Sequence, residues 1–280
     1  MREPFEKLLS GKTFQILSDL VYQHSRIRLG PDKQSLMANR LRKRLSILNL
    51  ESYEDYCDVL HSPHGSDEVE EMVDLISTNH TRFYREPEHF SFLTQQALPA
   101  LVQPLRAACT PLRLWSAAAS SGEEPYTMAI AVADFLRSHP GLEWEIVATD
   151  ISRRMLTVAH EGIYSMDSVK PVPLEQLKRY FKKGVGVRTG VCQVKLELRK
   201  HLHFERVNLF QPHLPVPANQ HVIFCRNVMI YFDLPSRALA VKRLAQHLAP
   251  GGYLMVGHSE SLMGINHGLY PVQQGVFQKT

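Results

Sequence analysis

The side chains best placed for chemistry follow apolar runs that the sequence predicts to be buried strands. They are Glu123, Asp150, Asn208 and the adjacent pair Arg226 and Asn227. The carboxyl ends of neighbouring parallel strands meet at one edge of a sheet, and doubly wound folds bind their ligands at that edge. We therefore expect these side chains to share one site.

The segment 112–126 predicts a strand, a loop of small residues and a helix. The apolar run Leu112 to Ala117 is typical of a buried strand, and the small residues up to Gly122 let a backbone approach a ligand closely. This is the plan of a mononucleotide-binding half, although a Gly-x-Gly-x-x-Gly fingerprint is absent. Glu123 and Glu124 would repel a pyrophosphate at the start of the helix. The loop therefore favours a nucleoside-like ligand without phosphates, of which S-adenosylmethionine is the commonest.

Asp150 ends the next predicted strand, which begins at Trp144. In a doubly wound fold, an acid at the end of the second strand binds the ribose hydroxyls of the ligand. An aspartate after a strand is as often a helix cap, but its position after the small-residue loop favours the ribose role. Ser152 then predicts the N-cap of the following helix.

The remaining sequence continues the alternation of strands and helices. One helix over 88–103 leads into the first strand, and another is predicted over 235–248. Further strands are predicted at residues 203–207, 222–225, 253–257 and 273–278. The alternation predicts an α/β domain over 91–280 with a largely parallel sheet.

A small antiparallel sheet is expected as an insertion at about residues 184–205. It follows a short helix over 173–183. Its turn-rich first part contains three glycines, Gly184, Gly186 and Gly190. Alternating apolar and polar residues from Cys192 to Leu198 then predict a half-buried antiparallel strand. Because no helix follows the glycines, they predict a hairpin loop and not a nucleotide motif.

Residues 1–76 predict a separate helical domain, because four stretches place apolar residues at helical spacing. Residues 1–50 hold ten basic and four acidic residues, whereas residues 51–90 hold two basic and eleven acidic ones. This uneven charge favours an interaction module. Residues 77–90 combine short polar side chains with arginines and aromatics, which predicts a linker suited to polar recognition.

Composition narrows the class of protein. The 280 residues are 44% hydrophobic with a net charge of +4, which fits a globular protein and is too small to indicate a nucleic-acid partner. The four cysteines are too far apart for a metal or redox motif. No apolar run reaches the roughly 18 residues of a membrane helix, and no signal peptide is evident. We expect a cytoplasmic protein, by default a monomer, without membrane insertion or a metal.

Four motifs resemble those of the chemotaxis receptor methyltransferases, the CheR family. In chain order they are Thr78-Asn-His-Thr-Arg-Phe-Tyr-Arg85, Trp-Ser-Ala-Ala-Ala-Ser-Ser-Gly-Glu-Glu-Pro-Tyr, Ile-Phe-Cys-Arg-Asn-Val-Met-Ile-Tyr-Phe and Gly-His-Ser-Glu-Ser. They span nearly the whole chain. The chain departs from the family pattern at His80 and Tyr84, where an apolar residue and Phe are more usual.

The resemblance implies a fold and an activity. The fold is a Rossmann-like class I S-adenosylmethionine-dependent methyltransferase sheet, with a small N-terminal all-helical domain and an inserted antiparallel β-subdomain. The activity is methyl esterification of glutamate side chains on chemoreceptors, for adaptation in chemotaxis signalling. S-adenosylmethionine is the methyl donor, and S-adenosylhomocysteine and glutamyl methyl esters are the products.

The resemblance also implies roles for residues in the first half of the chain. Three linker residues contact the cofactor, namely Asn79, Thr81 and Arg85. Glu123 holds the methionine amine of the cofactor, and Asp150 holds the ribose hydroxyls.

The second half contributes the adenine frame, Asn208 and Leu209, and two residues beneath the sulfonium, Arg226 and Asn227. Tyr231 is expected near the acceptor carboxylate. Because a glutamate side chain is already ionised at neutral pH, it needs no general base. Arg85 and Tyr231 are therefore expected to orient the reactants and not to exchange protons with them.

Two further groups of residues are expected to contact the receptor. Arg40, Lys43 and Arg44, on a basic helix, could dock the glutamate-rich receptor helices in a salt-dependent way. The loop with Gly184, Gly186 and Gly190 has the spacing of the loop that, in some family members, adds a receptor C-terminal peptide as an extra strand.

Three alternatives remain at this point. A nicotinamide oxidoreductase is disfavoured by the acids in the first loop and by the missing glycine fingerprint. A nucleic-acid methyltransferase is disfavoured because the chain contains no Pro-Pro and no Pro-Cys pair. A catalytically inactive receptor-binding adaptor would keep the same fold, and an assay of cofactor binding would test for it.

Overall fold

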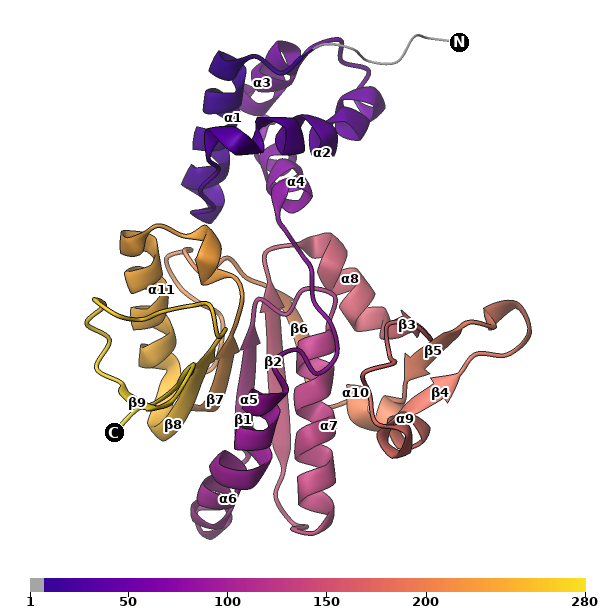
Figure 1. Ribbon diagram of the computed structural model, residues 1–280, viewed down its shortest axis with the longest axis vertical. Coiled ribbons are helices and arrows are strands. Elements are labelled where there is room, and N and C mark those ends of the chain that lie inside the picture. The colour runs from indigo at the N-terminus through magenta and orange to yellow at the C-terminus, as the bar shows by residue number, and fades with distance from the viewer. Residues whose placement is uncertain (1–7) are drawn as a thin grey trace. The chain divides into compact units, whose positions relative to one another are not determined.

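The structure is a computed structural model that describes residues 8–280, shown in Figure 1. The chain divides into two compact units. Among the described residues, the first unit comprises residues 8–78 and the short segment Tyr231–Ser236. The second unit comprises Asn79–Ile230 and Arg237–Thr280.

The first unit is helical, as its apolar spacing predicts. Its helices in the described part of the chain are α1 (Gly11–Ser25), α2 (Gln34–Ile47), α3 (Tyr53–His61) and α4 (Ser66–Ile76), with a 3-10 turn, η1 (Pro31–Lys33), before α2. Ser10 and Ser52 cap α1 and α3, because their hydroxyls accept backbone N–H groups of the first turn. Each helix turns its apolar face inward, and Leu17, Met37 and Met72 are fully buried there.

The second unit is built on a seven-stranded sheet with the order β6-β2-β1-β7-β8-β10-β9. The strands are β1 (Leu112–Ala117), β2 (Trp144–Asp150), β6 (Leu202–Arg206), β7 (Gln220–Cys225), β8 (Leu248–Val256), β9 (Tyr270–Gln273) and β10 (Val276–Gln278). The strands from β6 to β8 pair in parallel, and β10 pairs antiparallel with both β8 and β9. The predicted, largely parallel sheet is therefore confirmed.

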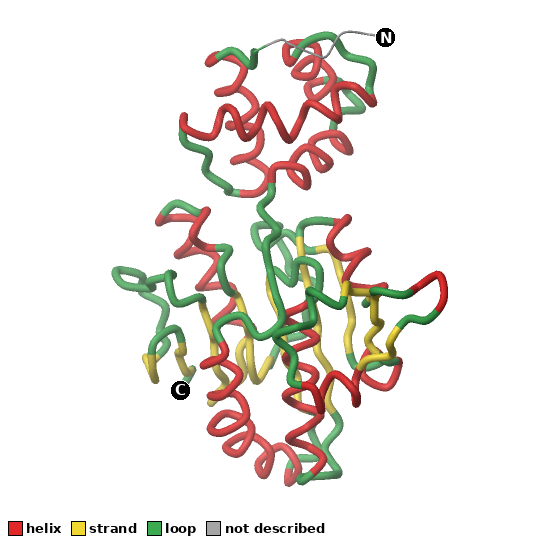
Figure 2. The backbone as a smooth tube through the Cα atoms, turned by 45° about the vertical axis from the view of Figure 1, so that its right-hand side comes forward, coloured by secondary structure: helices red, strands yellow, loops and turns green. Residues whose placement is uncertain are grey.

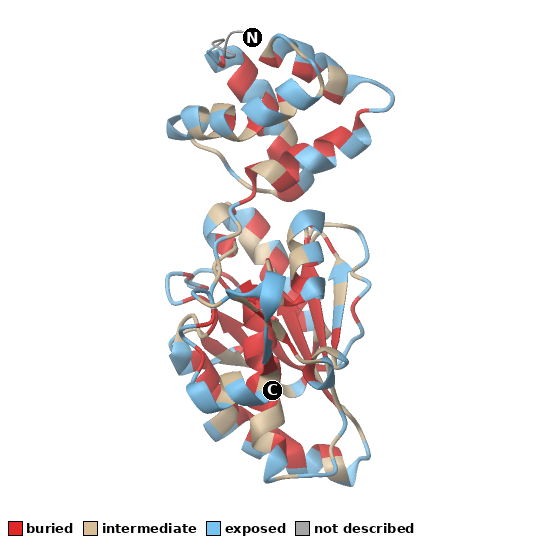
Figure 3. Ribbon diagram, turned by 90° about the vertical axis from the view of Figure 1, so that its right-hand side faces the viewer, coloured by how far each residue is buried: buried red, intermediate tan, exposed pale blue. Residues whose placement is uncertain are grey.

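Helices connect and cover these strands. They are α5 (Pro87–Phe92), a π-helical turn η2 (Leu93–Ala97), α6 (Leu98–Ala107), α7 (Glu123–Arg137), α8 (Arg153–Glu161), α9 (Leu174–Tyr180), α10 (Leu196–Arg199) and α11 (Leu234–His247). Two 3-10 turns are η3 (Gly186–Arg188) and η4 (Met229–Tyr231). Figure 3 shows the central strands buried, in red, and the outer helix faces exposed, in pale blue. Trp115 is fully buried in β1, where its indole nitrogen donates to Thr149 Oγ1 at 2.9 Å.

The small antiparallel sheet begins earlier than the predicted insertion at 184–205. Its strands are β3 (Ile163–Ser165), β4 (Phe181–Lys183) and β5 (Val191–Val194), in the order β3-β5-β4. Figure 2 shows these strands, in yellow, beside the large sheet. The end of the predicted range belongs to the large sheet, because Leu202–Arg206 is β6. Strands of three residues are too short to show a period, which is why the prediction missed β3 and β4.

Three predicted boundaries are wrong for a similar reason. The helix expected over 173–183 ends at Tyr180, because β4 follows. The strand expected to reach Leu198 ends at Val194. Leu196–Arg199 is a helical turn, although apolar and polar residues still alternate along its sequence. The strand expected at 273–278 is a hairpin that turns at Gly275, whose φ is +71°.

No helix between residues 8 and 280 is both long enough and apolar enough to span a bilayer.

Candidate functional site

The loop between β1 and α7 has an unusual backbone. Ala118, Ser120 and Gly122 all have positive φ, at 84°, 48° and 96°. The backbone N–H groups of Ala118 and Ala119 both donate to the Thr149 carbonyl, at 2.8 and 2.9 Å. These bonds fasten the loop to the end of β2.

Gly122 has no space for a side chain. A Cβ atom on this residue would lie 2.8 Å from both the Cβ of Ala159 and the hydroxyl of Tyr164. Its φ of 96° is also strained for any residue with a Cβ. This glycine therefore lets α7 start directly against α8 and the small sheet.

Asp150 joins the ends of the first two strands. Its Oδ2 accepts the backbone N–H of Ser120 at 2.8 Å, and its Oδ1 accepts the N–H of Ser152 at 2.8 Å. Ser152 in turn caps α8, as predicted, by accepting the N–H of Met155. Asp150 is 7% exposed, and these two bonds fix the orientation of its carboxylate. It is thus both a local cap and a fixed acceptor at the edge of the sheet.

Asn79 lies against the same loop. Its carbonyl accepts the hydroxyl of Ser120 at 2.8 Å. Its side-chain Nδ2 is buried and has no hydrogen-bond partner. A buried donor without a partner is costly in a folded protein, so this nitrogen fits a ligand that brings an acceptor.

The two acids that start α7 have different surroundings. Glu123 accepts the Ser121 hydroxyl at 2.6 Å, and burial raises the pKa of its carboxyl. Glu124 accepts the Ser116 hydroxyl at 2.8 Å and the Arg226 Nε at 2.7 Å. Glu123 can therefore receive an ammonium group, whereas Glu124 is already paired.

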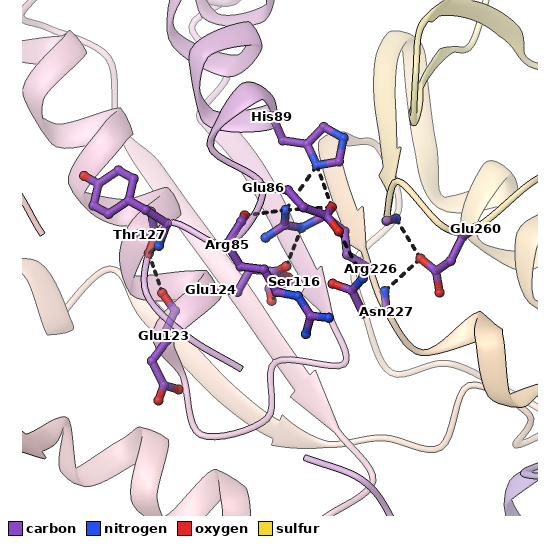
Figure 4. A network of polar contacts seen from close by, with 12 residues as sticks. Arg85, Glu86, His89, Ser116, Glu123, Glu124, Thr127, Arg226, Asn227 and Glu260 are labelled. Atoms are coloured by element: carbon purple, nitrogen blue, oxygen red, sulfur yellow. Dashed lines mark hydrogen bonds and ion pairs between the residues drawn. The ribbon is translucent and has the colours of Figure 1, made fainter. Parts of the chain in front are cut away.

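Arg226 is the centre of a buried polar network, shown in Figure 4. Besides Glu124, its Nη1 donates to the Arg85 carbonyl at 2.8 Å, to His89 Nδ1 at 3.1 Å and to Glu86 Oε2 at 3.3 Å. Its side chain is only 2% exposed. The guanidinium thus fastens the segment Arg85–His89 to β7 and α7, a role that the sequence did not predict.

Glu86, His89 and His258 place ligand-type atoms within 4.8 Å of one another, which raises the question of a metal. The guanidinium of Arg226 already donates to Glu86 and to His89 Nδ1. Burial, and then the charge of Arg226, lower the pKa of His89 to about 4, so the ring is a neutral acceptor. Two of these three groups are therefore already hydrogen-bonded to a cation of the protein.

Asn208 and Leu209 follow β6 next to Asp150. The N–H of Val207 donates to the Asp150 carbonyl at 3.0 Å, which brings the next residue to this edge of the sheet. Asn208 Oδ1 accepts the N–H of Phe210 at 2.9 Å, and Arg243 donates to the Leu209 carbonyl at 2.8 Å. The turn is thus held from both sides.

The other predicted site residues are placed as follows. Arg85 donates to the His80 carbonyl at 2.9 Å, and Thr81 is half-buried in the same linker. Asn227 follows Arg226 and has a left-handed φ of 59°. Tyr231 belongs to the first compact unit, where its carbonyl accepts the N–H of Arg28 at 2.9 Å. Its role near the acceptor remains a prediction.

The three basic residues of α2 differ in their surroundings. Arg44 donates to both carboxylate oxygens of Glu68. Arg40 donates to the carbonyls of Ile76 and Ser77 at the end of α4. Lys43 is exposed, and the described residues offer it no ion-pair partner. Two of the three charges are therefore engaged within the helical unit.

Sequence reasoning missed several residues that build the site. Ser120 links Asn79 to Asp150, and Glu86, His89 and Glu260 surround Arg226 and Asn227. Two signals were present: Glu86 directly follows the linker motif, and Glu260 lies within the Gly-His-Ser-Glu-Ser motif. Neither signal shows which partner the acid would find.

The comparison with known proteins defines the class. Residues 79–277 match the family model "CheR methyltransferase, SAM binding domain", and residues 12–77 match "CheR methyltransferase, all-alpha domain". The second unit is thus an S-adenosylmethionine-binding methyltransferase domain, and the cofactor and fold predictions are confirmed.

Curated relatives make the assignment more specific. A chemotaxis protein methyltransferase of Salmonella typhimurium is 38% identical over 257 residues, which is 92% of this chain and 86% of that protein. The one of Escherichia coli is 38% identical over 253 residues, covering 90% and 85%. Chemotaxis protein methyltransferase 2 of Pseudomonas aeruginosa is 36% identical over 265 residues, covering 94% and 91%. The chain belongs to the CheR methyltransferase family.

Proposed function

We propose that this protein is a protein-glutamate O-methyltransferase of chemoreceptors, acting in the cytoplasm in adaptation of chemotaxis signalling. The observation that carries the proposal is the family membership, since relatives that align over most of the chain are named chemotaxis protein methyltransferases. The acceptor would be a glutamate side chain, and the product a glutamyl methyl ester.

The site suits an acceptor that is already ionised. A glutamate carboxyl has a pKa of about 4.3, so no residue has to remove a proton from it at neutral pH. S-adenosylmethionine supplies a methyl group on a positively charged sulfur. The task of the protein is then to align the two groups and exclude water. We assign orienting roles to Arg85 and Tyr231 for this reason.

The cofactor contacts are assigned by the chemistry of each side chain. Asn79 Nδ2, buried and without a partner, fits the carboxylate of the methionine part. Glu123 fits the ammonium, and Asp150 fits the ribose hydroxyls. Thr81, from the linker, completes this set. We assign Asn208 and Leu209 to the adenine, and Asn227 to the sulfonium end. Arg226 acts by holding its neighbours, because its buried side chain is occupied by protein acceptors.

Receptor contacts form the third part of the proposal. Lys43 is the exposed charge among the α2 residues proposed for docking, while Arg40 and Arg44 would act mainly by shaping the helical unit. For the tether, β4 pairs with β5 alone and so has a free edge in the three-stranded sheet. Val185 and Val187, beside Gly184 and Gly186, are 80% and 104% exposed. A receptor C-terminal peptide could extend this edge as a further strand.

The test is methyl transfer to a receptor. The protein is incubated with a receptor cytoplasmic fragment and methyl-labelled S-adenosylmethionine, and base-labile label on receptor glutamates is measured. We expect transfer by wild type, loss of most transfer in Asp150→Ala, and little change in Asp167→Ala, which alters an exposed aspartate of the same unit.

Two results would contradict the proposal in different ways. Tight binding of S-adenosylhomocysteine without any transfer to receptor fragments would favour the adaptor alternative. Transfer to a residue other than glutamate would keep the enzyme class and overturn the substrate.

A further inference from the structure

The Gly-His-Ser-Glu-Ser motif places a buried carboxylate beneath the turn that carries Asn227. Glu260 is 6% exposed. Its Oε2 accepts the backbone N–H groups of Asn227 at 2.7 Å and Gly257 at 2.6 Å, and its Oε1 accepts that of Met229 at 2.7 Å. Figure 4 shows the carboxylate facing Asn227. Three N–H bonds to one buried carboxylate are enough to fix the course of this turn.

The turn needs such a fastening because it is tight. Asn227 has a φ of 59°, a left-handed conformation that asparagine adopts more readily than most residues with a side chain. A Cβ on Gly257 would lie 2.6 Å from Asn227 Nδ2 and 2.8 Å from Glu260 Oε2. The end of β8 therefore packs directly against the asparagine amide, which has no freedom to move in that direction.

A second carboxylate sets the rotation of the asparagine side chain. Asn227 Nδ2 donates to Glu86 Oε1 at 3.1 Å. Glu86 is itself held, because its Oε2 accepts the Arg226 guanidinium at 3.3 Å. A carboxylate accepts hydrogen bonds and repels a carbonyl oxygen, so the nitrogen of the amide must face Glu86. The oxygen, Oδ1, then faces away from it and has no partner among residues 8–280.

We propose that Glu86 and Glu260 are positioning residues that hold Asn227 so that its Oδ1 is presented to the cofactor as an acceptor. Glu260 fixes the backbone and Glu86 fixes the amide. This inference rests on the proposed function, because the group that Oδ1 meets is a hydroxyl or a positively charged group of S-adenosylmethionine. The two acids touch neither cofactor nor substrate.

The role of Glu86 is tested by exchanging the carboxylate at position 86 and the amide at position 227. Asn227→Asp puts a second carboxylate against Glu86, which repels it. In the double variant with Glu86→Gln, the new amide can donate to the new carboxylate while its oxygen still accepts from Arg226. Affinity for S-adenosylhomocysteine is measured by calorimetry for wild type, both single variants and the double variant.

We expect Asn227→Asp to weaken binding about tenfold or more, and the double variant to return to within about threefold of wild type. Additive losses in the double variant would overturn the role of Glu86. Glu88→Gln, the same change at an exposed acid two residues away, is the matched control. If wild type itself binds no S-adenosylhomocysteine, the proposed function fails. The thermal unfolding midpoints of the same four proteins then still test the hydrogen bond between positions 86 and 227.

The role of Glu260 is tested first by hydrogen exchange in the free protein and then by cofactor binding. In Glu260→Gln, the side-chain amide directs N–H groups at backbone N–H groups, so at least one of the three bonds must break. We expect amide hydrogen exchange at Asn227, Met229 and Gly257 to become about tenfold faster or more, with weaker cofactor binding. Exchange as slow as in Glu88→Gln would overturn the assignment.

Discussion

Asn79 is the single residue whose surroundings point most directly to a ligand. Its carbonyl is bonded to Ser120, while its side-chain nitrogen is buried without a partner. A folded protein gains nothing from such a donor until an acceptor arrives. The residue therefore contributes more to binding than to stability.

Replacement of this side chain should separate the two effects. We expect Asn79→Ala to weaken S-adenosylhomocysteine binding about tenfold, and to leave the free energy of unfolding of the free protein within about 0.5 kcal/mol of wild type or slightly above it. Calorimetric titration and denaturant unfolding measure the two quantities. Asn266→Ala, at an exposed asparagine of the same unit, is the control. A large loss of stability without ligand would show that Asn79 is a structural residue.

His89 makes the buried network sensitive to acid. Burial lowers the pKa of His89 from 6.5 to about 4. Between these pH values, His89 is protonated in the unfolded chain and neutral in the folded chain. Stability is then present above about pH 6.5 and falls as the pH drops towards 4, by up to about 3 kcal/mol. Glu123 and Glu260, whose pKa values burial raises, act in the opposite sense in acid.

The measurement therefore compares how steeply the free energy of unfolding falls with pH in wild type and in a variant. Free energies of unfolding are determined between pH 7 and about pH 4 for wild type and His89→Gln. The decline should become shallower in the variant, because glutamine accepts from Arg226 without titrating. Burial also lowers the pKa values of His201, His221 and His267, so their share of the decline should remain. His64→Gln, at an exposed histidine, is the matched control. If the free energy of unfolding of the variant falls with pH as steeply as that of wild type, His89 does not cause the decline.

At the scale of elements, the loop from β1 to α7 decides where the site can form. Its positive φ values and its two bonds to the Thr149 carbonyl hold it against the end of β2. Asp150 and Ser120 then connect strand, loop and linker in one hydrogen-bonded series. The site is thus assembled by three elements, and a shift in any one of them would move the others.

Two glycines with nearly the same φ, Gly122 in this loop and Gly141 between α7 and β2, allow backbone strain to be distinguished from steric contact. Gly122 has a φ of 96° and no room for a Cβ, whereas Gly141 has a φ of 92° and open space around it. We expect Gly141→Ala to cost about 1 to 2 kcal/mol of stability from backbone strain alone. Gly122→Ala should cost about 1 to 3 kcal/mol more, because the added methyl group overlaps Ala159, and it should weaken cofactor binding. Equal losses in denaturant unfolding would mean that the contact at Gly122 relaxes freely.

At the scale of the whole molecule, the family matches place the cofactor-binding domain in one of the two units. The family matches assign cofactor binding to residues 79–277 and leave the helical unit outside that domain. Basic residues dominate the first fifty positions of the chain, which suits the proposed docking of a receptor segment that carries acceptor glutamates. Attraction between exposed charges is screened by salt, so docking of this kind should depend on ionic strength.

Reversal of one charge tests this division. We expect Lys43→Glu to lower methyl transfer to a receptor fragment about threefold to tenfold at low salt, and less at high salt. Its affinity for S-adenosylhomocysteine should equal that of wild type. Lys12→Glu makes the same change at an exposed position of α1 and should have the smaller effect. A weaker cofactor affinity in Lys43→Glu would contradict the division.

The sequence by itself determined the order and type of the main elements. Apolar residues at a helical period give the four N-terminal helices, and apolar runs give β1, β2 and β7 within a residue or two. It also determined the class of ligand, because small residues followed by two acids suit a nucleoside without phosphates. These features are local, since they depend on neighbours within one turn or one strand.

Only the tertiary structure decided which partner each acidic side chain binds. Glu123 and Glu124 are adjacent and alike in sequence, yet Glu124 is taken by Arg226, 102 residues away, and Glu123 is not. Glu86 and Glu260 likewise find Asn227 across 141 and 33 residues. A buried carboxylate is defined by the donor that it meets, and such donors are brought together only when distant segments fold against one another.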